Sequence, residues 1–444
     1  MLKPTTDNNN GNYHVPEENL DDLERIGNHD LKYLYEQNRD LLVFPQSLGQ
    51  HGDNINKSMV FSLQGNILRT NNIMGFVGRN ETQLTISSRF AGTDENRDHG
   101  DYFLHYMLQK VFAINLFRFD QTTNNESIWD FLLYLFPYYL KKAYSQGLYK
   151  AYKKEEYNDA NVKGVIDIRR HIRFNIPFSG KIAYTTREHS YDNNLTQLIR
   201  HTIEYIKLNP FGCGILTSDA EIRDIISKFS FVTQNSYDKN NRNKIITANL
   251  KPVSHPYYTE YRILQKICLQ ILKRKKITFG ARKDKIYGLL FDGAWLWEEY
   301  LGKILCKKYW HPQNITKTRR NFLFIDEKNK ERQEIYPDFI SKSDPKIIAD
   351  AKYKFLNENE YGKDYGRDDF FQILAYMFRY TSEKGYLLFP YNSDGIFAEK
   401  LRIKNNTRSV LTLLGLPIPQ NSPDFNSFKN EIQKSELNFI NMMI

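Results

Sequence analysis

The amino-acid sequence predicts an α+β protein of several domains. A chain of 444 residues is too long for one compact core, and 41% hydrophobic residues are enough to bury more than one. The pattern also changes along the chain, from β-rich to mixed helical and then to the order helix, three strands, helix, strand. We therefore expect a polar extension (1–55), a β-rich N-terminal module (56–125), a mixed α/β and largely helical middle region (126–250) and a C-terminal αβββαβ core within 251–444.

The N-terminal part contains the β-rich pattern. Residues 1–55 are polar and irregular, and we expect at most one helix there. Between residues 57 and 90, glycines and asparagines separate four short apolar runs, SMVFSL, NILRT, NIMGFV and QLTISSRF. Short apolar runs divided by turn residues predict strands, so this module should be a small meander or partial barrel.

A helix should end the N-terminal module, and the middle region should combine helices with strand-like segments. Apolar residues recur at helical spacing in 101–118 and 127–144, and Pro137 should kink or break the second helix. A further helix should begin at about residue 194. The segment 162–174 has strand character and carries four cations. These are Arg169, Arg170, His171 and Arg173.

Charge and cysteine content restrict the class of protein. The formal net charge is +10, which weakly favours a polyanionic partner such as DNA. Three scattered cysteines suggest neither zinc nor disulfides, which fits a reducing compartment. The N-terminus has no apolar run of signal-peptide type and no segment is long enough to span a bilayer, so we expect a cytoplasmic protein. Because no phosphate-loop motif occurs, we expect the chain itself to bind no nucleotide.

The C-terminal region contains the predicted core. A helix should span 291–305, followed by the strands NFLFI, QEIYPDFI and KIIADAKYKFL. The segment DDFFQILAYMFRY predicts a second helix, and KGYLLF predicts a last strand that stops at Pro390. An amphipathic helix before this core ends in a basic cluster, a candidate DNA contact. This cluster consists of Lys273, Arg274, Lys275 and Lys276.

A motif for phosphodiester hydrolysis lies on the predicted strands. Pro337-Asp338 is followed by Asp350-Ala351-Lys352. Because side chains alternate along a strand, Asp350 and Lys352 should project from one side. Two carboxylates supply the oxygen ligands that magnesium prefers, and a lysine can stabilise charge on the phosphate. The motif is short enough to occur by chance, so two solvated aspartates at strand ends are the alternative.

Two helices add candidate residues. Glu298 on the helix before the strands could be a further metal ligand, with Glu299 and Asp292 as rivals. Gln372 and Tyr376 are four residues apart and share a helix face, where they could contact the metal water and the DNA backbone. The alternative for these residues is an ordinary polar helix surface.

Motif and element order together resemble the PD-(D/E)xK nuclease superfamily, and Gln372 with Tyr376 resembles its RecB-like branch. The chain resembles more closely the McrC family, the nuclease subunits of McrBC-type modification-dependent restriction systems. The matching segments are VGRNETQLTISSRF, GLYKAY, GVIDIRRHIRF, LLFDGAWLWEEYL, YPDFI and IIADAKYK.

This resemblance implies a DNA endonuclease that uses Mg²⁺ or Mn²⁺. Asp338, Asp350 and Glu298 would bind the metal, and Lys352, Gln372 and Tyr376 would complete the catalytic set. It also implies a partner, a hexameric AAA+ GTPase that recognises modified DNA and translocates it, with possible self-association through the complex. Residues 1–55 match nothing in the family.

Two other functions remain open. A freestanding RecB-like repair nuclease would cleave plain DNA without a motor. A non-catalytic adaptor would activate an NTPase and would carry a decayed nuclease fold. The basic segment 169–173 could bind phosphate, but a solvated face or a contact with a partner protein is slightly favoured.

Overall fold

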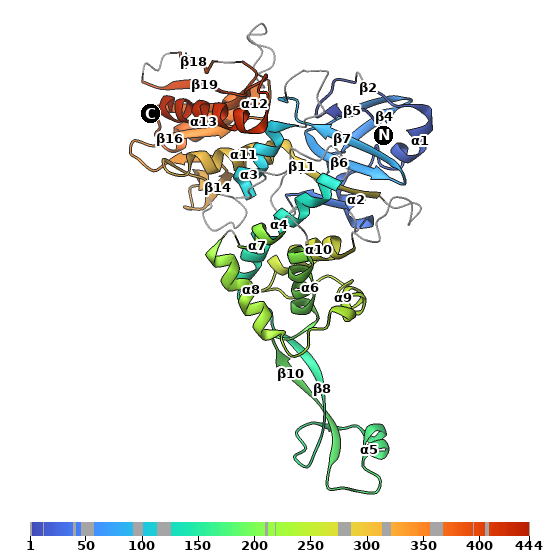
Figure 1. Ribbon diagram of the computed structural model, residues 1–444. Coiled ribbons are helices and arrows are strands. Elements are labelled where there is room, and N and C mark those ends of the chain that lie inside the picture. The colour runs from blue at the N-terminus through green and yellow to red at the C-terminus, as the bar shows by residue number, and fades with distance from the viewer. Residues whose placement is uncertain are drawn as a thin grey trace. The chain divides into compact units, whose positions relative to one another are not determined.

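The computed structural model divides the chain into two compact units (Figure 1). Unit 1 combines Met1–Thr123 with Phe279–Ile444, and unit 2 is Asn124–Thr278. The division differs from the predicted boundaries at residues 55 and 250, because both fall inside a unit. The structure describes residues 2–11, 13–38, 41–45, 57–91, 101–112, 126–208, 212–217, 219–273, 286–312, 321–355, 367–393, 395–404 and 408–443.

The N-terminal part of unit 1 contains two small sheets. One has the strand order β1-β7-β6-β11-β3 and the other β2-β5-β4. The predicted strands between residues 57 and 90 are confirmed. The strands of both sheets are β1 (Thr5–Thr6), β2 (Tyr13–His14), β3 (Leu41–Phe44), β4 (Phe61–Gln64), β5 (Ile67–Thr70), β6 (Ile73–Arg79), β7 (Thr82–Ser87) and β11 (Ile286–Asp292).

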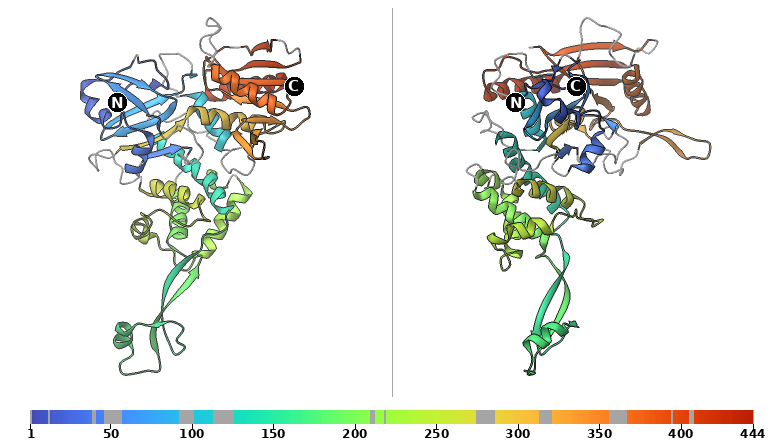
Figure 2. Two further views of the ribbon diagram at one scale, coloured as in Figure 1. Left: turned by 180° about the vertical axis from the view of Figure 1, so that it is seen from behind. Right: turned by 90° about the vertical axis from the view of Figure 1, so that its right-hand side faces the viewer.

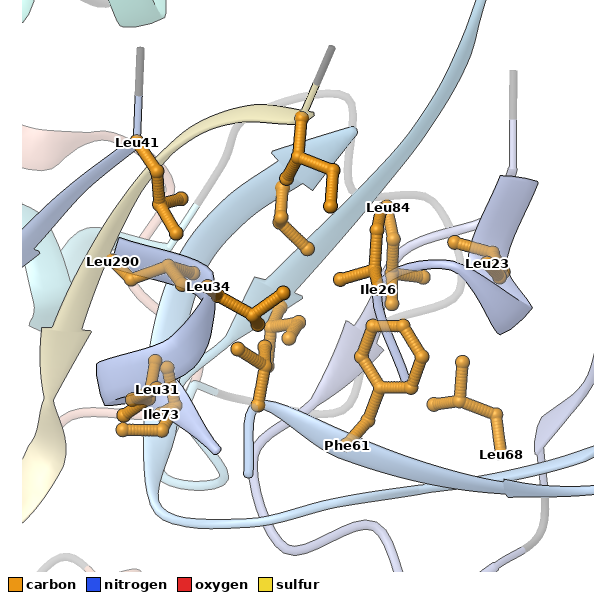
Figure 3. Packing of buried hydrophobic residues seen from close by; sticks show 14 of the residues in the cluster. Leu23, Ile26, Leu31, Leu34, Leu41, Phe61, Leu68, Ile73, Leu84 and Leu290 are labelled. Carbon is orange, nitrogen blue, oxygen red and sulfur yellow. The ribbon is translucent and has the colours of Figure 1, made fainter. Parts of the chain in front are cut away.

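The first 55 residues are not an irregular extension, so this prediction is wrong. They form β1, β2 and β3 and two helices, α1 (Glu17–Glu24) and α2 (Leu31–Gln37). Sparse leucines in this polar stretch, such as Leu23 and Leu34, are fully buried in a core with Phe61, Leu84 and Leu290 (Figure 3). These helices were not recognised in the sequence because only one side of each is buried, so each contains few apolar residues.

Strand β11 joins the N-terminal sheet to the later part of the chain. It lies between β6, to which it is antiparallel, and β3, to which it is parallel. Opposite Leu290 stands Gly75, with φ +120°, and a Cβ there would lie 2.1 Å from the carbonyl oxygen of Leu289. Only glycine permits this approach. A strand from beyond residue 250 thus completes the N-terminal sheet.

The C-terminal part of unit 1 is built on a sheet with the order β12-β15-β16-β17-β19-β18. Helix α12 packs against β16 and β17, and α13 packs against β19. These elements are α11 (Gly293–Leu305), β12 (Tyr309–Trp310), β15 (Phe339–Ser341), β16 (Ile347–Ala351), α12 (Arg367–Arg379), β17 (Lys384–Tyr391), β18 (Phe397–Arg402), β19 (Val410–Pro417) and α13 (Phe425–Met442).

The predicted order of helices and strands is present, with three differences. The segment NFLFI is β13 (Asn321–Ile325), which pairs with β14 (Glu331–Ile335) in a separate two-stranded sheet. The segment QEIYPDFI forms two strands, β14 and β15, because Pro337 between them has no N–H to donate. Strand β17 continues through Pro390, and the N–H of Ile418 donates to the carbonyl of Tyr391 (2.8 Å).

A helix from the N-terminal part packs into this C-terminal part. Helix α3 (Tyr102–Phe112) contacts α11 and α13. The hydroxyls of Tyr106 and Tyr300 donate to one carboxylate oxygen of Glu436, at 2.9 and 2.8 Å. Lys110 pairs with the other oxygen at 3.1 Å. This buried carboxylate is therefore fully partnered, as burial requires.

Unit 2 combines a group of helices with a long β-hairpin (Figures 1 and 2). Helix α10 packs against α4 and α6, so the segment 260–273 belongs here and not to the C-terminal core. The helices are α4 (Glu126–Tyr144), α6 (Asn194–Leu208), α7 (Gly212–Thr217), α8 (Ala220–Val232), α9 (Arg242–Ala248), α10 (Glu260–Lys273) and a 3₁₀ turn at Lys239–Asn241. Helix α4 continues through Pro137 as one helix, so Pro137 does not break it.

The hairpin consists of β8 (Ala151–Asp159) and β10 (Ile182–Ser190), with β9 (Val165–Ile166) paired near its tip. The strand predicted over 162–174 is mostly wrong, because Ile168–Phe174 form helix α5. Asp167 caps this helix by accepting a hydrogen bond from the N–H of Arg170 (3.1 Å). Within the described residues, no helix is long and apolar enough to cross a membrane.

Candidate active site

Asp338 and Asp350 meet where β15 and β16 pair. The antiparallel register places Phe339 opposite Ala349, and one more step along it sets Asp338 opposite Asp350. Asp350 is 2% exposed, and Asp338 is half-buried. One Asp338 oxygen accepts a hydrogen bond from the N–H of Ala351 at 2.8 Å. The structure therefore brings the two predicted carboxylates together at one edge of β16.

Burial and mutual repulsion govern the charge of this pair. Burial raises the pKa of Asp338 well above its usual range, and the negative charges of Asp350 and Glu298 raise it further. Burial also raises the pKa of Asp350, although the charge of Lys352 opposes that rise. Two carboxylates so placed favour a shared proton or a cation between them.

Lys352 lies directly beside Asp350. Its Nζ is 2.6 Å from Oδ2 of Asp350, which confirms that the two side chains project together. It also donates to Oε1 of Gln372 at 2.9 Å and lies 3.3 Å from Oδ1 of Asp369. Burial, the largest single influence, would lower the pKa of Lys352, but the charges of Asp350, Asp369 and Asp338 and the hydrogen bond to Asp350 together outweigh it, and the pKa is raised. The ammonium therefore stays charged at neutral pH.

Helix α12 supplies three polar side chains on one face. Gln372 connects the cluster, since its Nε2 donates to the Tyr376 hydroxyl at 3.0 Å. Asp369 was missed in the sequence, although it is three residues before Gln372 and so lies on the same helix face. Asp369 also pairs with Lys354 at 2.7 Å. The predicted pair Gln372 and Tyr376 thus reaches the carboxylates through Lys352.

Helix α11 contributes the predicted acidic residues in different ways. Asp292 caps the helix by accepting from the N–H of Trp295 (2.7 Å), a structural role. The negative charge of Glu298 contributes to the raised pKa of Asp338. His311 was missed in the sequence. Its Nδ1 lies 2.9 Å from the carbonyl oxygen of Asp338, and its Nε2 lies 3.7 Å from Glu298 and 4.0 Å from Glu299.

The donor set suits magnesium bound by two carboxylates rather than a cage of protein ligands. Within the part of the chain that the structure describes, no three His, Cys, Asp or Glu side chains form a metal-binding group. Magnesium commonly keeps water and substrate phosphate as ligands and takes only one or two carboxylates from the protein. The facing Asp338 and Asp350 meet that need, and a cation would relieve their repulsion.

The predicted basic residues all belong to unit 2, whereas the carboxylates belong to unit 1. Arg169 and Arg173 are exposed on α5, and Arg170 pairs with Glu156 at 3.3 Å. Lys273 is the last residue of α10. Arg274, Lys275 and Lys276 lie outside the described residues.

A polar cavity of about 500 Å³ lies in unit 2. Its walls come from α6, α9 and the base of the hairpin, and buried His201 is among the lining residues. No predicted site residue lines it. Size alone does not make it the centre of the chemistry, because the paired carboxylates and Lys352 are all in unit 1.

Solved structures offer distant likenesses. One is a refined half-complex from a tetradecameric assembly of Thermococcus gammatolerans McrB AAA+ hexamers with bound McrC, 14% identical over 99% of both chains with a TM-score of 0.46. Another is a cryo-EM structure of the Thermococcus gammatolerans McrBC complex, 14% identical over 71% of this chain and 89% of that one, with a TM-score of 0.31. No curated protein matches this sequence.

Family membership rests on the sequence rather than on these likenesses. The sequence pattern of one protein family matches residues 68–390, which contain β6, β7, unit 2, the carboxylate pair and Lys352. The predicted family is thereby confirmed. Since its model matches residues 68–390, this chain belongs to the family of McrBC 5-methylcytosine restriction system components.

Proposed function

We propose that this chain is the DNA endonuclease subunit of a McrBC-like, modification-dependent restriction complex, dependent on Mg²⁺ or Mn²⁺. One observation carries the proposal: Asp338 and Asp350 face each other with the Lys352 ammonium 2.6 Å from Asp350. Two carboxylates can hold a metal ion, and a charged lysine beside them can stabilise the charge that develops during phosphodiester hydrolysis. Membership of the restriction family supports DNA as the substrate.

Each side chain has a defined task in this proposal. Asp338 and Asp350 would hold the metal ion, which would polarise the phosphodiester and activate water when bound. Lys352 has no lone pair while charged, so it acts as a hydrogen-bond donor toward a phosphate oxygen and not as a ligand. Gln372 and Asp369 hold the Lys352 ammonium in place through the contacts at 2.9 and 3.3 Å. Glu298 forms no three-ligand group with Asp338 and Asp350 among the described residues, so we assign its negative charge a supporting part in attracting the cation.

Assembly with an AAA+ GTPase is the second part of the proposal. The tip of the unit 2 hairpin exposes several apolar side chains, and patches of exposed apolar side chains commonly bind other proteins. We call this set the tip patch. It consists of Val165, Ile166, Ile168, Ile172, Phe174, Ile176 and Phe178, each more than 45% exposed. The interleaved arginines on α5 would suit acidic groups of the motor.

Metal removal and replacement test the function. The chain and its cognate AAA+ GTPase, mixed with methylated DNA and GTP, should cleave in Mg²⁺ or Mn²⁺, and EDTA should stop cleavage. The chain alone should hydrolyse no GTP but should raise the partner's GTP turnover. If stimulation occurs and no metal restores cleavage, the adaptor alternative replaces the nuclease. If unmodified DNA is cleaved equally well without the partner, the freestanding repair nuclease replaces it.

A further inference from the structure

Tyr353 follows the candidate catalytic Lys352 and is 3% exposed. Its hydroxyl lies 2.8 Å from Oγ of Ser88 and 3.4 Å from the sulfur of Met74. Ser88 directly follows β7 and Met74 is on β6, so both partners come from the N-terminal sheets. Residues more than 260 positions apart in the sequence thus meet one residue away from Lys352.

The ring of Tyr353 is also held by groups from the N-terminal part. The Arg89 guanidinium lies 4.9 Å from the ring centroid, a cation–π distance. The Phe90 ring packs edge-on at 5.1 Å. Arg89 is itself fixed by the fully buried Asp7, which it meets at 2.7 Å. The contacts of Tyr353 are therefore with side chains that have little freedom to move.

The start of helix α11 restricts the ring as well. Gly293 is the first residue of this helix, and a Cβ there would lie 2.7 Å from Cε1 of Tyr353. The N–H of Gly293 donates to the carbonyl of Asn72 at 2.8 Å, which fixes the helix start to the N-terminal part. Because α11 carries Glu298, the same ring contacts the element that brings the third acidic residue.

The backbone transmits this constraint to the candidate site. The N–H of Lys352 donates to the carbonyl of Leu388 at 2.8 Å, so the chain stays extended just past the end of β16. Side chains of successive extended residues point to opposite faces. Holding Tyr353 on one face therefore limits how the backbone can rotate at Lys352, whose side chain projects from the other.

We infer that Tyr353 is a positioning residue: the N-terminal part of unit 1 clamps its ring and thereby fixes the strand end that carries Asp350 and Lys352. The inference rests on the proposed nuclease function. It assigns the N-terminal part a role in the chemistry as well as in folding. Misplacement of a catalytic group by about 1 Å can cost about a hundredfold in rate, so such a clamp is functionally valuable.

Two substitutions at Tyr353 test the clamp in the full-length chain with its partner, methylated DNA, GTP and Mg²⁺. Tyr353→Leu removes the hydroxyl and the aromatic face, and should lower kcat on the order of tenfold or more with little change in the KM for DNA. Tyr353→Phe keeps the ring contacts and should retain most of the activity. Tyr261→Phe is the matched control, because it removes a buried hydroxyl bonded to the Gly147 carbonyl (2.6 Å) in unit 2. Rates are compared per folded molecule.

A double-mutant cycle separates the clamp from general destabilisation. Gly293→Ala should lower kcat in the otherwise natural chain, because its methyl group displaces the Tyr353 ring. In the Tyr353→Leu background the same change should cost much less, since the clash is gone. Additive losses in kcat would overturn the inference.

Hydrogen exchange supplies a readout that needs no cleavage. Tyr353→Leu, and Gly293→Ala to a smaller degree, should accelerate exchange of the Lys352 N–H, while Tyr261→Phe should not. Unchanged exchange together with unchanged kcat in Tyr353→Leu would refute the clamp and leave the nuclease proposal intact. If the natural chain itself cleaves nothing in any metal, the proposed function fails, and the exchange experiment still decides the clamp. Should Tyr353→Leu not fold, Gly293→Ala decides alone: a lower kcat with faster exchange of the Lys352 N–H supports the clamp, and the absence of both changes overturns it.

Discussion

In unit 1 the charged side chains of the candidate site are buried or half-buried against one another, whereas in unit 2 apolar side chains are exposed at the tip of a hairpin. Both arrangements cost free energy in an isolated chain. Buried like charges need a cation, and exposed apolar groups need a covering surface. The comparison suggests that the unit 1 arrangement serves metal and DNA chemistry and that the unit 2 arrangement serves assembly. The predictions below test whether these two tasks separate.

The largest effect should follow loss of one carboxylate. Asp350→Asn keeps the size of the side chain and removes its charge, so the proposed metal site loses one of its two best-placed ligands. Cleavage of methylated DNA in Mg²⁺ should be abolished, while stimulation of the partner's GTPase should persist. Asp368→Asn, an exposed carboxylate of α12, is the matched control and should cleave normally. Asp338→Asn should behave like Asp350→Asn.

Either carboxylate variant could contradict the separation. Undiminished cleavage by a folded Asp350→Asn protein would remove this residue from the site. Loss of GTPase stimulation in the same variant would show that unit 1 also carries assembly.

The second largest effect concerns Lys352. Lys352→Ala removes the proposed donor to the phosphate, so the cleavage rate should fall on the order of a hundredfold or more. Metal binding should remain, because both carboxylates stay, and it can be measured by calorimetry with Mn²⁺. Complex formation should also survive. If Lys352→Ala dissolves the complex and leaves residual cleavage unchanged, the lysine is structural. A non-catalytic adaptor then becomes the better explanation of the chain's function.

Substitutions in the tip patch should weaken assembly with the partner and leave the candidate site in unit 1 intact. Ile168 and Ile172 are one helical turn apart on α5 and both are more than half exposed. Replacing both by serine should weaken binding to the AAA+ partner by roughly tenfold or more, since each buried apolar anchor contributes about 1 kcal/mol or more. Phe231→Ser is the matched control, because Phe231 is an exposed apolar residue of α8 outside the tip patch. Binding can be followed by interferometry.

The tip variant also tests whether units 1 and 2 have separate tasks. Unit 1 should be unaffected, so the thermal unfolding of the double variant should match that of the natural chain. Equal binding by the double variant and by Phe231→Ser would show that the tip patch is not the docking surface.

Local patterns in the sequence predicted that Asp350 and Lys352 lie together, but they did not predict how distant segments of the chain combine. Asp350 and Lys352 could be placed on one face because strand alternation is a local rule, and the 2.6 Å contact bears this out. Asp369 and His311 were missed, since their proximity depends on how α12 and β12 pack. The helix over Ile168–Phe174 was mistaken for a strand because β-branched residues outweighed the Asp167 cap.

The first 55 residues show why domain boundaries could not be predicted. Their core contacts are with Phe61, Leu84 and Leu290, and Leu290 lies on a strand more than 240 residues further along. No local pattern in the sequence predicts that β11 lies between β3 and β6. Hydrophobic burial is non-directional, so a few leucines in a polar stretch do not reveal their partners.

The smallest effect on cleavage, and a clear effect on stability, should come from the N-terminal core. Leu34 on α2 is fully buried, so Leu34→Ala should lower the free energy of unfolding by about 2–5 kcal/mol. Lys32→Ala changes an exposed residue of the same helix and should stay within about 0.5 kcal/mol of the natural chain.

Because β3 pairs with β11, and β11 leads directly into α11 and Glu298, the carboxylate site should lose its structure in the same transition. Denaturation followed by far-UV circular dichroism and by residual cleavage should therefore give one midpoint, shifted equally for both probes. At low temperature, where the variant stays folded, cleavage should be nearly natural. A Leu34→Ala protein as stable as the natural chain would contradict the burial argument for Leu34. Cleavage that survives after the N-terminal part has unfolded would show that the nuclease centre is independent of residues 1–55.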